Sequence, residues 1–296
     1  MNSIFITGST GFVGRNIIQY FDSEFKFYKY SKNEEININQ DVILHLAGKA
    51  HDLKNNSNAE EYYIVNTELT KRVFNNFLES DAKVFIILSS VKAVADELKC
   101  ELTEEYIPNP ITHYGKSKLL GEQYILSKQI PEEKRVYILR PCMIHGPGNK
   151  GNLNLLYKIV RNGLPWPLGA FENKRSFCSI DNLCFIIREL IENDQISSGI
   201  YNIADDIPFS TNELINLISV GLDKKPHFWN IPQSLIKSFS KLGDVLRLPL
   251  NSERLSKFTE TYLVSNNKIK NAINKPLPIS SKDGLIKTFN SFNNNA

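Results

Sequence analysis

The chain has 296 residues, of which 42% are hydrophobic and 23% charged, so it is long enough to bury one large core or two modest ones. No apolar run approaches the roughly 20 residues of a membrane-spanning helix, MNSIFITG lacks the features of a signal peptide, and the net charge of +3 is spread out. These properties predict a cytoplasmic globular protein that neither inserts into a membrane nor binds nucleic acid. The four cysteines and five histidines have no metal-binding spacing, so neither a disulfide framework nor a metal site is expected.

The N-terminus predicts a strand, a glycine turn and a helix. Residues 3–7 (SIFIT) are β-branched and aromatic, GSTGFVG follows at once, and RNIIQYF has apolar residues at helical spacing. In such a turn the three glycines provide a tight turn, a close approach for a pyrophosphate, and close packing of helix on strand. A bare strand-to-helix turn is the alternative. The residues expected to contact a dinucleotide here are Gly8, Thr10, Gly11, Phe12, Val13 and Gly14.

The end of the next strand, 25–31, bears on the choice of cofactor. A carboxylate at this place would hold the ribose 2′-hydroxyl of NAD, but Ser31 and Lys32 stand there. A lysine beside a hydroxyl can pair with the 2′-phosphate of NADP, so the choice between NAD and NADP leans towards NADP; a solvated lysine is the other interpretation.

A third strand, 41–48, follows after only KNEEININQ, so one crossover helix is expected to be missing. Its last residues, Leu46, Ala47 and Gly48, are expected to let a cofactor lie across the end of the strand.

Helices and strands then alternate. The pattern predicts helices over 61–80 and 108–128, strands over 83–90, 135–141 and 199–206, and a helix over 182–192 capped by Asp181. This order predicts an α/β protein with a Rossmann-like, doubly wound parallel sheet, whose ligand crevice lies at the carboxyl ends of the strands. Ser90 lies at such an end. Helices over 211–221 and 232–243 are expected in a smaller C-terminal lobe.

A spacing typical of proton-transfer chemistry, Tyr-x-x-x-Lys, occurs three times, at Tyr28/Lys32, Tyr114/Lys118 and Tyr124/Lys128. Spacing alone does not identify a functional pair, and the position relative to other motifs has to decide.

The motif order distinguishes the three pairs. The glycine turn, Ser89-Ser90 and Tyr114-x-x-x-Lys118 together resemble the extended short-chain dehydrogenases/reductases, the NAD-dependent epimerase/dehydratase family. HLAGKAH, SSVKAVAD, HYGKSK, LRPCMIHGPGNKGN and NKRSFCSIDNL are similar to its nucleotide-diphosphate-sugar 4-epimerase and 4-keto-reductase branch. Only Tyr114/Lys118 follows Ser90 at the family's separation. The resemblance implies that Ser90, Tyr114 and Lys118 are catalytic, that Tyr114, Lys118 and Pro141 also contact the nicotinamide cofactor, that the substrate is a nucleotide sugar, and that the chain forms a homodimer.

The proposed chemistry explains these residue types. A sugar C4 hydroxyl must lose its proton as its hydride leaves, so a base is needed within hydrogen-bond reach. Because tyrosine has a pKa of about 10, Lys118 and the positive nicotinamide ring are expected to lower the pKa of Tyr114. Ser90 would orient the reacting oxygen.

The segment after Pro141 is rich in turn residues and is expected to face the substrate. The resemblance implies that Arg175 binds the nucleotide diphosphate, and Asn152 is a second polar contact or a turn residue. The predicted domains are 1–142 plus about 176–206, which bind the dinucleotide, and 143–175 plus about 207–296, which form the substrate-binding lobe. The histidines near the crevice, His45, His51 and His145, are expected to be structural.

Four functions remain open. The first is a 4-epimerase, in which the keto intermediate takes the hydride back on its other face, and the second is an NADPH-dependent 4-keto reductase with the same catalytic residues. A third is a non-catalytic, cofactor-sensing regulator, which would not need Ser90, Tyr114 and Lys118. The fourth, a dehydratase, would need an acidic residue near the serines, and SSVKAV has none.

Overall fold

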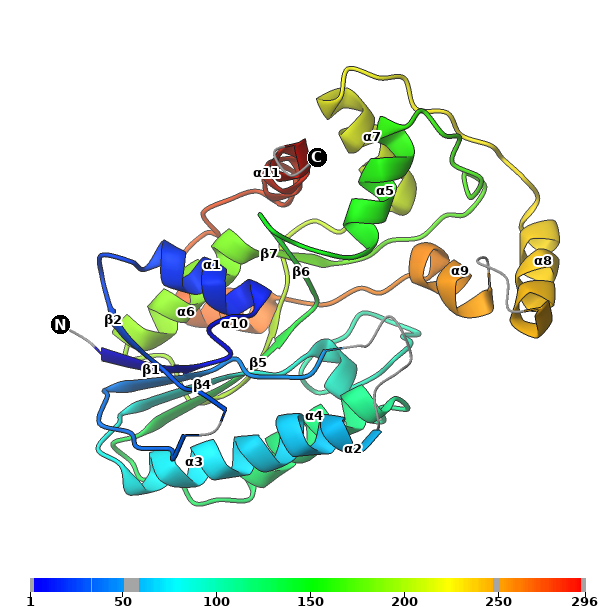
Figure 1. Cartoon of the computed structure of the whole chain (residues 1–296). Coiled ribbons are helices and arrows are strands. Elements are labelled where there is room, and N and C mark those ends of the chain that lie inside the picture. Colours follow the sequence, from blue (N-terminus) through cyan, green and yellow to red (C-terminus); the bar gives the residue numbers. More distant parts are fainter. Residues whose placement is uncertain (1–2, 33, 51–58, 247–250, 294–296) are drawn as a thin grey trace. The chain divides into compact units, whose positions relative to one another are not determined.

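The computed structural model describes residues 3–32, 34–50, 59–246 and 251–293 (Figure 1). The chain folds into two compact units. The first unit consists of Met1–Ile144, Cys178–Ala204 and Val264–Ile279, and the second of His145–Phe177, Asp205–Leu263 and Ser280–Ala296. The chain therefore passes from one unit to the other several times, and each unit is assembled from segments far apart in the sequence.

A six-stranded parallel sheet forms the centre of the first unit, in the order β2-β1-β3-β4-β5-β8. Its strands are β1 (Ser3–Thr7), β2 (Lys26–Lys29), β3 (Val42–His45), β4 (Val84–Leu88), β5 (Arg135–Pro141) and β8 (Gly199–Ile203). β3 and β4 are buried along their whole length, as expected of strands covered on both faces. All six expected strands are present, but 46–48 and 89–90 lie beyond the strand ends.

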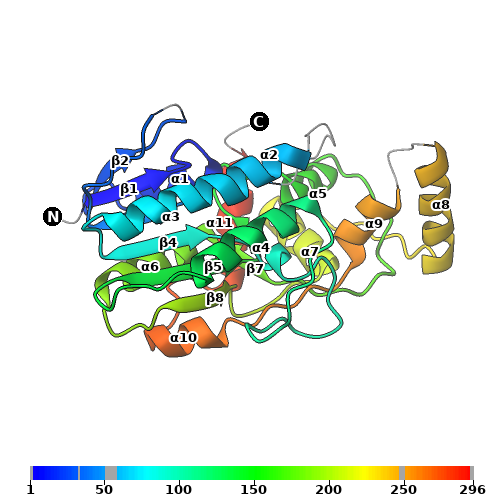
Figure 2. The ribbon, with the colours of Figure 1, turned by 90° about the horizontal axis from the view of Figure 1, so that it is seen from below.

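Helices cover both faces of this sheet, so the predicted doubly wound Rossmann-like fold is confirmed (Figures 1 and 2). Helices α1 (Phe12–Tyr20) and α6 (Ile180–Glu192) pack together over one face, and α3 (Leu69–Glu79) and α4 (His113–Leu126) over the other. Under α3 the rings of Phe74, Phe77 and Phe85 meet in the core, with centroids 5.0 to 5.8 Å apart. No helix lies between β2 and β3 among the described residues, as the short link predicts.

Three expected helices differ in detail. The helix expected over 61–80 is α2 (Ala59–Tyr63), a π-helical turn (Ile64–Glu68) and α3. The helix expected over 108–128 begins only at His113, because Thr112 caps it by accepting a hydrogen bond from the backbone N–H of Gly115. The prediction that Asp181 caps the next helix is wrong: the Ser179 hydroxyl is the cap, and Asp181 lies in the first turn.

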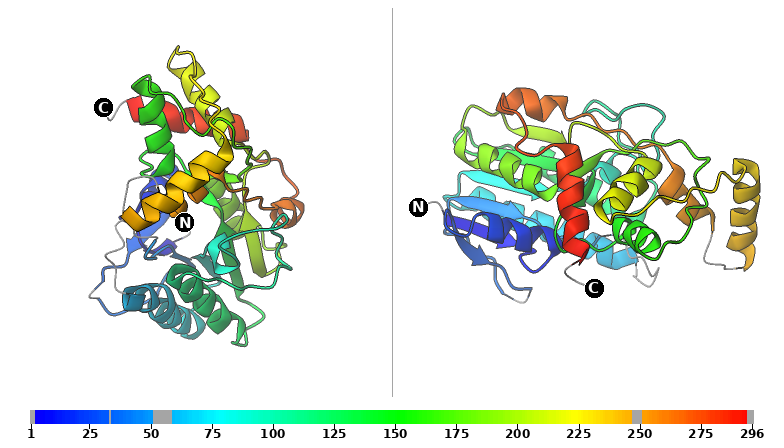
Figure 3. Two further views of the ribbon diagram at one scale, coloured as in Figure 1. Left: turned by 90° about the vertical axis from the view of Figure 1, so that its right-hand side faces the viewer. Right: turned by 90° about the horizontal axis from the view of Figure 1, so that it is seen from above.

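The second unit is mainly helical (Figure 3). It contains α5 (Asn152–Arg161), α7 (Thr211–Gly221), α8 (Gln233–Leu246), α9 (Ser252–Thr259) and α11 (Ser281–Asn293). α5 and α11 each pack on α7, and α8 packs on α9. β6 (Met143–His145) and β7 (Phe177–Ser179) pair in a two-stranded sheet. α10 (Asn267–Ile273) belongs to the first unit, where it contacts β8. Within the described residues, no helix has the length and apolar character needed to cross a membrane.

Candidate functional site

The glycine turn after β1 is built for close backbone approach. Gly8 has φ +73°, and a Cβ on it would lie 2.6 Å from the backbone nitrogen of Ala47. A Cβ on Gly14 would lie 2.3 Å from the Gly8 carbonyl oxygen, so helix α1 can start here only with glycine at this place. Gly11 is the N-cap of α1 and has no side chain to cover the first N–H groups. These features fit the pyrophosphate of a dinucleotide at the helix N-terminus.

The turn lies directly against the segment that follows β3. The backbone N–H of Leu46 donates to the Thr7 carbonyl (3.2 Å), and that of Ala47 donates to the Thr7 hydroxyl (3.0 Å). Because β1 and β3 are neighbouring parallel strands, their carboxyl ends meet at one edge of the sheet. Two groups of residues predicted to bind the cofactor, the glycine turn and 46–48, are therefore adjacent. Pro141 is buried at the carboxyl end of β5, on the same edge.

Tyr114 and Ser90 meet at this edge. Ser90 follows β4 and is nearly buried, and its hydroxyl accepts the backbone N–H of Lys92 at 3.2 Å. Its side chain is also hydrogen-bonded to that of Tyr114, in the first turn of α4. The Tyr114 ring packs edge to face on Tyr62, with centroids 6.3 Å apart. The structure thus brings together two of the three residues predicted to be catalytic.

Lys118, the third residue, lies one helical turn further along α4. Its Nζ donates to the Leu88 carbonyl at 2.9 Å, and a Cβ on Gly48 would lie 2.7 Å from this Nζ. The ammonium is therefore held between the end of β4 and the segment after β3. Burial lowers the pKa of Lys118 to about 8, against a smaller opposing effect of the Glu122 carboxylate.

The pKa of Tyr114 is raised above its usual value, because burial outweighs the hydrogen bond from Ser90, which lowers it. The expected lowering by Lys118 is therefore not found. In the protein alone, burial therefore favours the protonated form of the phenol.

A buried ion pair under the serines was missed by the sequence analysis. The Arg140 guanidinium contacts both carboxylate oxygens of Glu122, with Nε at 3.1 Å from each and Nη2 at 2.5 Å from Oε2. The Ser89 hydroxyl donates to the same carboxylate. Tyr114, Lys118 and Glu122 are spaced by four residues, so they share one face of α4, and that spacing was the available signal. The pair joins α4 to the ends of β4 and β5.

Asn66, in the π-helical turn, was also missed. Its amide oxygen accepts from the backbone N–H of Lys49 (2.8 Å), and its amide nitrogen donates to the Lys49 carbonyl (3.1 Å) and the Ser117 hydroxyl (3.0 Å). Asn66 thus fixes the chain just after Gly48 against α4, beside Lys118. A π-helical turn cannot be recognised from apolar spacing, although such turns are frequent at functional sites.

His45 is fully buried between two hydroxyls. Its Nδ1 lies 2.7 Å from the Thr7 hydroxyl and its Nε2 lies 3.0 Å from that of Thr70. Burial, and secondarily the charge of Lys118, lower its pKa to about 3. These contacts favour the structural role predicted for His45. His145, in the second unit, is also buried, with Nδ1 2.8 Å from the Thr288 hydroxyl and Nε2 3.4 Å from an Asp205 oxygen. His51 lies outside the described residues.

The buried imidazole of His45 predicts a specific acid sensitivity. Since its pKa is about 3 in the folded chain and about 6.5 in the unfolded chain, the unfolded chain binds the extra proton between these values, and stability falls as the pH drops below about 6.5. The loss should be about 1.4 kcal/mol per pH unit. Urea unfolding measures how much the free energy of unfolding falls between pH 6.5 and pH 4.5. In His45→Gln this fall should be smaller than in the wild type by roughly 2–3 kcal/mol. In His227→Gln, at an exposed position, it should equal that of the wild type. Equal pH dependence in His45→Gln and wild type would contradict this.

Beyond β2, the structure adds a carboxylate that the sequence analysis did not place there. Lys32 is exposed, as is the neighbouring Ser31. Glu34 folds back so that its carboxylate accepts the backbone N–H of Ser31 at 3.3 Å, while its own N–H donates to the Ser31 carbonyl at 3.1 Å. A basic and an acidic residue therefore both lie in the segment where a cofactor ribose is expected.

The two residues predicted to bind the substrate both lie in the second unit. Asn152 is the first residue of α5, after Gly151 at φ +154°. The backbone of Arg175 pairs with Phe209, N–H to carbonyl at 2.9 Å in both directions, and its guanidinium donates to the Lys257 carbonyl in the last turn of α9.

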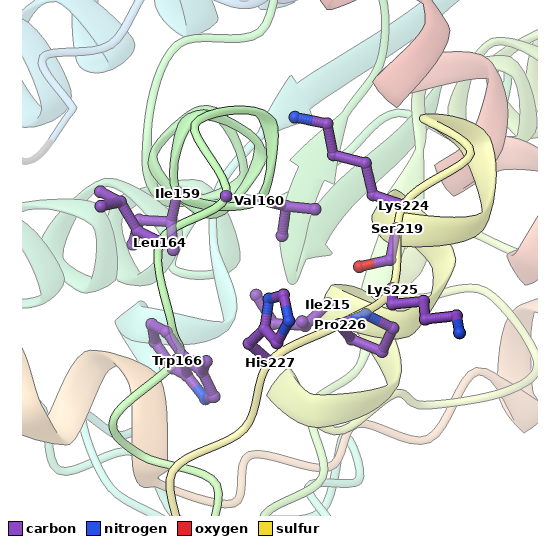
Figure 4. A pocket seen from close by; sticks show the side chains of 11 residues that line it. Ile159, Val160, Leu164, Trp166, Ile215, Ser219, Lys224, Lys225, Pro226 and His227 are labelled. Atoms are coloured by element: carbon purple, nitrogen blue, oxygen red, sulfur yellow. The ribbon is translucent and has the colours of Figure 1, made fainter.

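Two cavities lie in the second unit. One, of about 450 Å³, lies between α8, α9 and Phe171-Glu172, and its wall includes Lys237, Lys241, Ser256 and Thr259. The other, of about 150 Å³, lies between α5 and α7 (Figure 4). Its wall includes Trp166 and His227, and the Ser219 hydroxyl there has no hydrogen-bond partner within the described chain. Only the larger cavity reaches the size range of sites for cofactors and small molecules.

Comparison with known proteins agrees with this geometry. The NAD dependent epimerase/dehydratase family matches residues 31–204. The chain is 28% identical to a UDP-glucose 4-epimerase of Vibrio cholerae, over 98% of this chain and 95% of that protein. It is 25% identical to an N-acetyl-alpha-D-glucosaminyl-diphospho-ditrans,octacis-undecaprenol 4-epimerase of Escherichia coli O157:H7, over 88% and 86%. Among solved structures, the UDP-N-acetylglucosamine 4-epimerase of Bacillus cereus superposes with a TM-score of 0.77 and 17% identity, covering 99% of this chain and 100% of that one.

Proposed function

Because the chain belongs to the NAD dependent epimerase/dehydratase family, we propose that it is an enzyme that oxidises and reduces C4 of a nucleotide-diphosphate sugar, in the first place as a 4-epimerase. The observation that carries the proposal is the arrangement of Tyr114, hydrogen-bonded to Ser90, with Lys118 on the same helix against the segment that adjoins the glycine turn. The epimerase relatives support the substrate class.

In this proposal Ser90 holds the C4 hydroxyl of the sugar and Tyr114 exchanges its proton. Tyr114 takes the proton of the C4 hydroxyl as the C4 hydride leaves, and returns it when the resulting ketone is reduced. When bound, the nicotinamide cofactor supplies the hydride acceptor and donor, and its positive charge favours the phenolate of Tyr114. The Ser90 hydroxyl orients the reacting oxygen, and Lys118 binds the nicotinamide ribose.

The second unit contributes the substrate residues in this proposal. Arg175 binds the diphosphate, because a planar guanidinium suits phosphate oxygens, and Asn152 is a second polar contact. Arg175 donates to the backbone of α9, the helix whose Ser256 and Thr259 line the cavity of about 450 Å³, which supports this unit as the substrate-binding lobe. The predicted homodimer remains part of the proposal.

The proposed cofactor is NAD or NADP. Lys32 favours a 2′-phosphate, whereas the Glu34 carboxylate favours a 2′-hydroxyl. The nicotinamide released by denaturing the purified protein separates the two enzyme functions: retained NAD indicates the epimerase, and exchangeable NADPH indicates the 4-keto reductase.

The direct test is to incubate the protein with UDP-glucose, UDP-N-acetylglucosamine and 4-keto-6-deoxy sugar nucleotides and to follow C4 by NMR. We expect inversion at C4 of one UDP-sugar without net use of cofactor. Reduction of a keto sugar with consumption of NADPH would support the reductase instead. A chain that binds the nicotinamide nucleotide but changes none of these sugars would favour the cofactor-sensing regulator.

A further inference from the structure

Helix α8 exposes a row of four large apolar side chains, here called the α8 stripe. Its members and their exposed fractions are Leu235 (50%), Phe239 (60%), Leu242 (49%) and Leu246 (58%). Their spacing of four, three and four residues places them along one side of the helix, over three turns. Exposed apolar residues scattered singly are ordinary, but a continuous row of this kind marks an interaction surface.

The stripe is exposed although α8 is held in place on another side. Ile236 and Ser240 are buried, and the Asp244 carboxylate accepts the backbone N–H (2.9 Å) and the hydroxyl (2.6 Å) of Ser252, at the start of α9. Figures 1 and 2 show α8 beside α9, at the end of its unit. α9 thus already covers one side of α8, and the stripe lies on a different side.

The charge of this part of the chain points to an anionic partner. Residues 224–257 contain seven Lys or Arg and two Asp or Glu, a net charge of +5, whereas the whole chain carries +3. The remainder of the chain is therefore slightly acidic. On α8 itself, Lys237 and Lys241 are exposed on the side that faces the cavity of about 450 Å³, away from the stripe. An amphipathic helix with an apolar face and nearby basic residues is typical of a segment that lies in a membrane interface.

The size of the stripe argues against a second copy of the chain as its partner. Four side chains that are about half exposed offer on the order of 400 Å², whereas a stable protein interface needs about 800 Å² from each partner. A bilayer sets no such minimum, because each apolar side chain that enters it contributes separately.

We propose that the α8 stripe docks this protein on the surface of an anionic phospholipid bilayer. The four apolar side chains enter the boundary between head groups and acyl chains, and the net positive charge of 224–257 attracts the protein to the anionic surface. This inference goes beyond the proposed function and does not depend on it, because no residue of the stripe belongs to the proposed catalytic or binding set.

The test is flotation of the 296-residue chain with vesicles. We expect binding to phosphatidylcholine vesicles containing phosphatidylglycerol, weaker binding to pure phosphatidylcholine, and weakening by salt. Phe239→Ser/Leu242→Ser should bind the vesicles at least roughly tenfold more weakly than the wild type, because two of the four inserting side chains are removed. Leu235→Ser/Leu246→Ser is the second variant, should the first fold poorly by circular dichroism.

The matched control is Ile207→Ser/Val220→Ser, which removes two exposed apolar side chains (59% and 79%) elsewhere in the same unit and should bind as the wild type does. Turnover of a soluble UDP-sugar should be unchanged in all variants, so a failure of the docking proposal is distinguished from a failure of the proposed function. Equal flotation of stripe variants and control would overturn the proposal. Failure of the wild type to bind either kind of vesicle would overturn it as well. Dimerisation of such a non-binding wild type through the stripe, measured by analytical ultracentrifugation, would show that the partner is a second copy of the chain.

Discussion

Replacing Tyr114 by phenylalanine is expected to lower turnover by at least about a thousandfold, because it removes the only oxygen proposed to exchange the proton of the C4 hydroxyl. The ring and its edge-to-face contact with Tyr62 remain, so the fold should be kept. Ser90 loses one partner, but its hydroxyl still accepts the backbone N–H of Lys92. The first measurement is the rate of C4 inversion. The second is the nicotinamide content of the purified variant, and this content should equal that of the wild type.

Tyr124→Phe is the matched control for this experiment. Tyr124, on the same helix, begins another Tyr-x-x-x-Lys pair whose lysine lies beyond the end of α4, and its hydroxyl donates to the Asn75 side chain at 2.7 Å on an exposed surface. Its loss should leave turnover unchanged. Full activity in Tyr114→Phe, or equal losses in both variants, would show that Tyr114 is not the proton-exchanging group.

Replacing Glu122 by alanine is expected to lower the free energy of unfolding by about 3–5 kcal/mol, because it leaves the Arg140 guanidinium buried without its counter-charge. Both side chains are nearly inaccessible, at 1% and 3% exposed. Turnover should fall as well, since Glu122 lies on the face of α4 that carries Tyr114 and Lys118, and holds Ser89 next to Ser90. Urea unfolding and the rate of C4 inversion measure the two effects.

Two further variants make the Glu122 result specific. Glu68→Ala breaks an exposed pair with Lys71 and should cost no more than about 0.5 kcal/mol. Glu122→Leu/Arg140→Met removes both charges and should recover much of the stability lost in Glu122→Ala, because an apolar pair of similar volume carries no desolvation penalty. A loss below about 1 kcal/mol in Glu122→Ala would mean that Arg140 finds other partners or water.

The sequence by itself determined the sheet and the main elements of the candidate site. Apolar runs predicted all six parallel strands, and the short link after β2 predicted that no helix stands before β3. These features could be predicted because they follow from local spacing and from turn residues, which depend on neighbours in the sequence. Motif order then selected Tyr114/Lys118 among three pairs with the same spacing, and the structure brings Tyr114 next to Ser90.

Only the tertiary structure decided the environment of these groups. The raised pKa of Tyr114, the buried pair of Glu122 and Arg140, and Asn66 in a π-helical turn all arise where segments distant in sequence meet. The carboxylate of Glu34 beside Ser31 depends on a turn that the strand pattern does not specify. Which face of an amphipathic helix is covered is a tertiary property too, since apolar spacing predicts α8 but not that Leu235, Phe239, Leu242 and Leu246 stay exposed. Desolvation and pairing are set by every element that packs around a group, and the order of residues along one element does not contain that information.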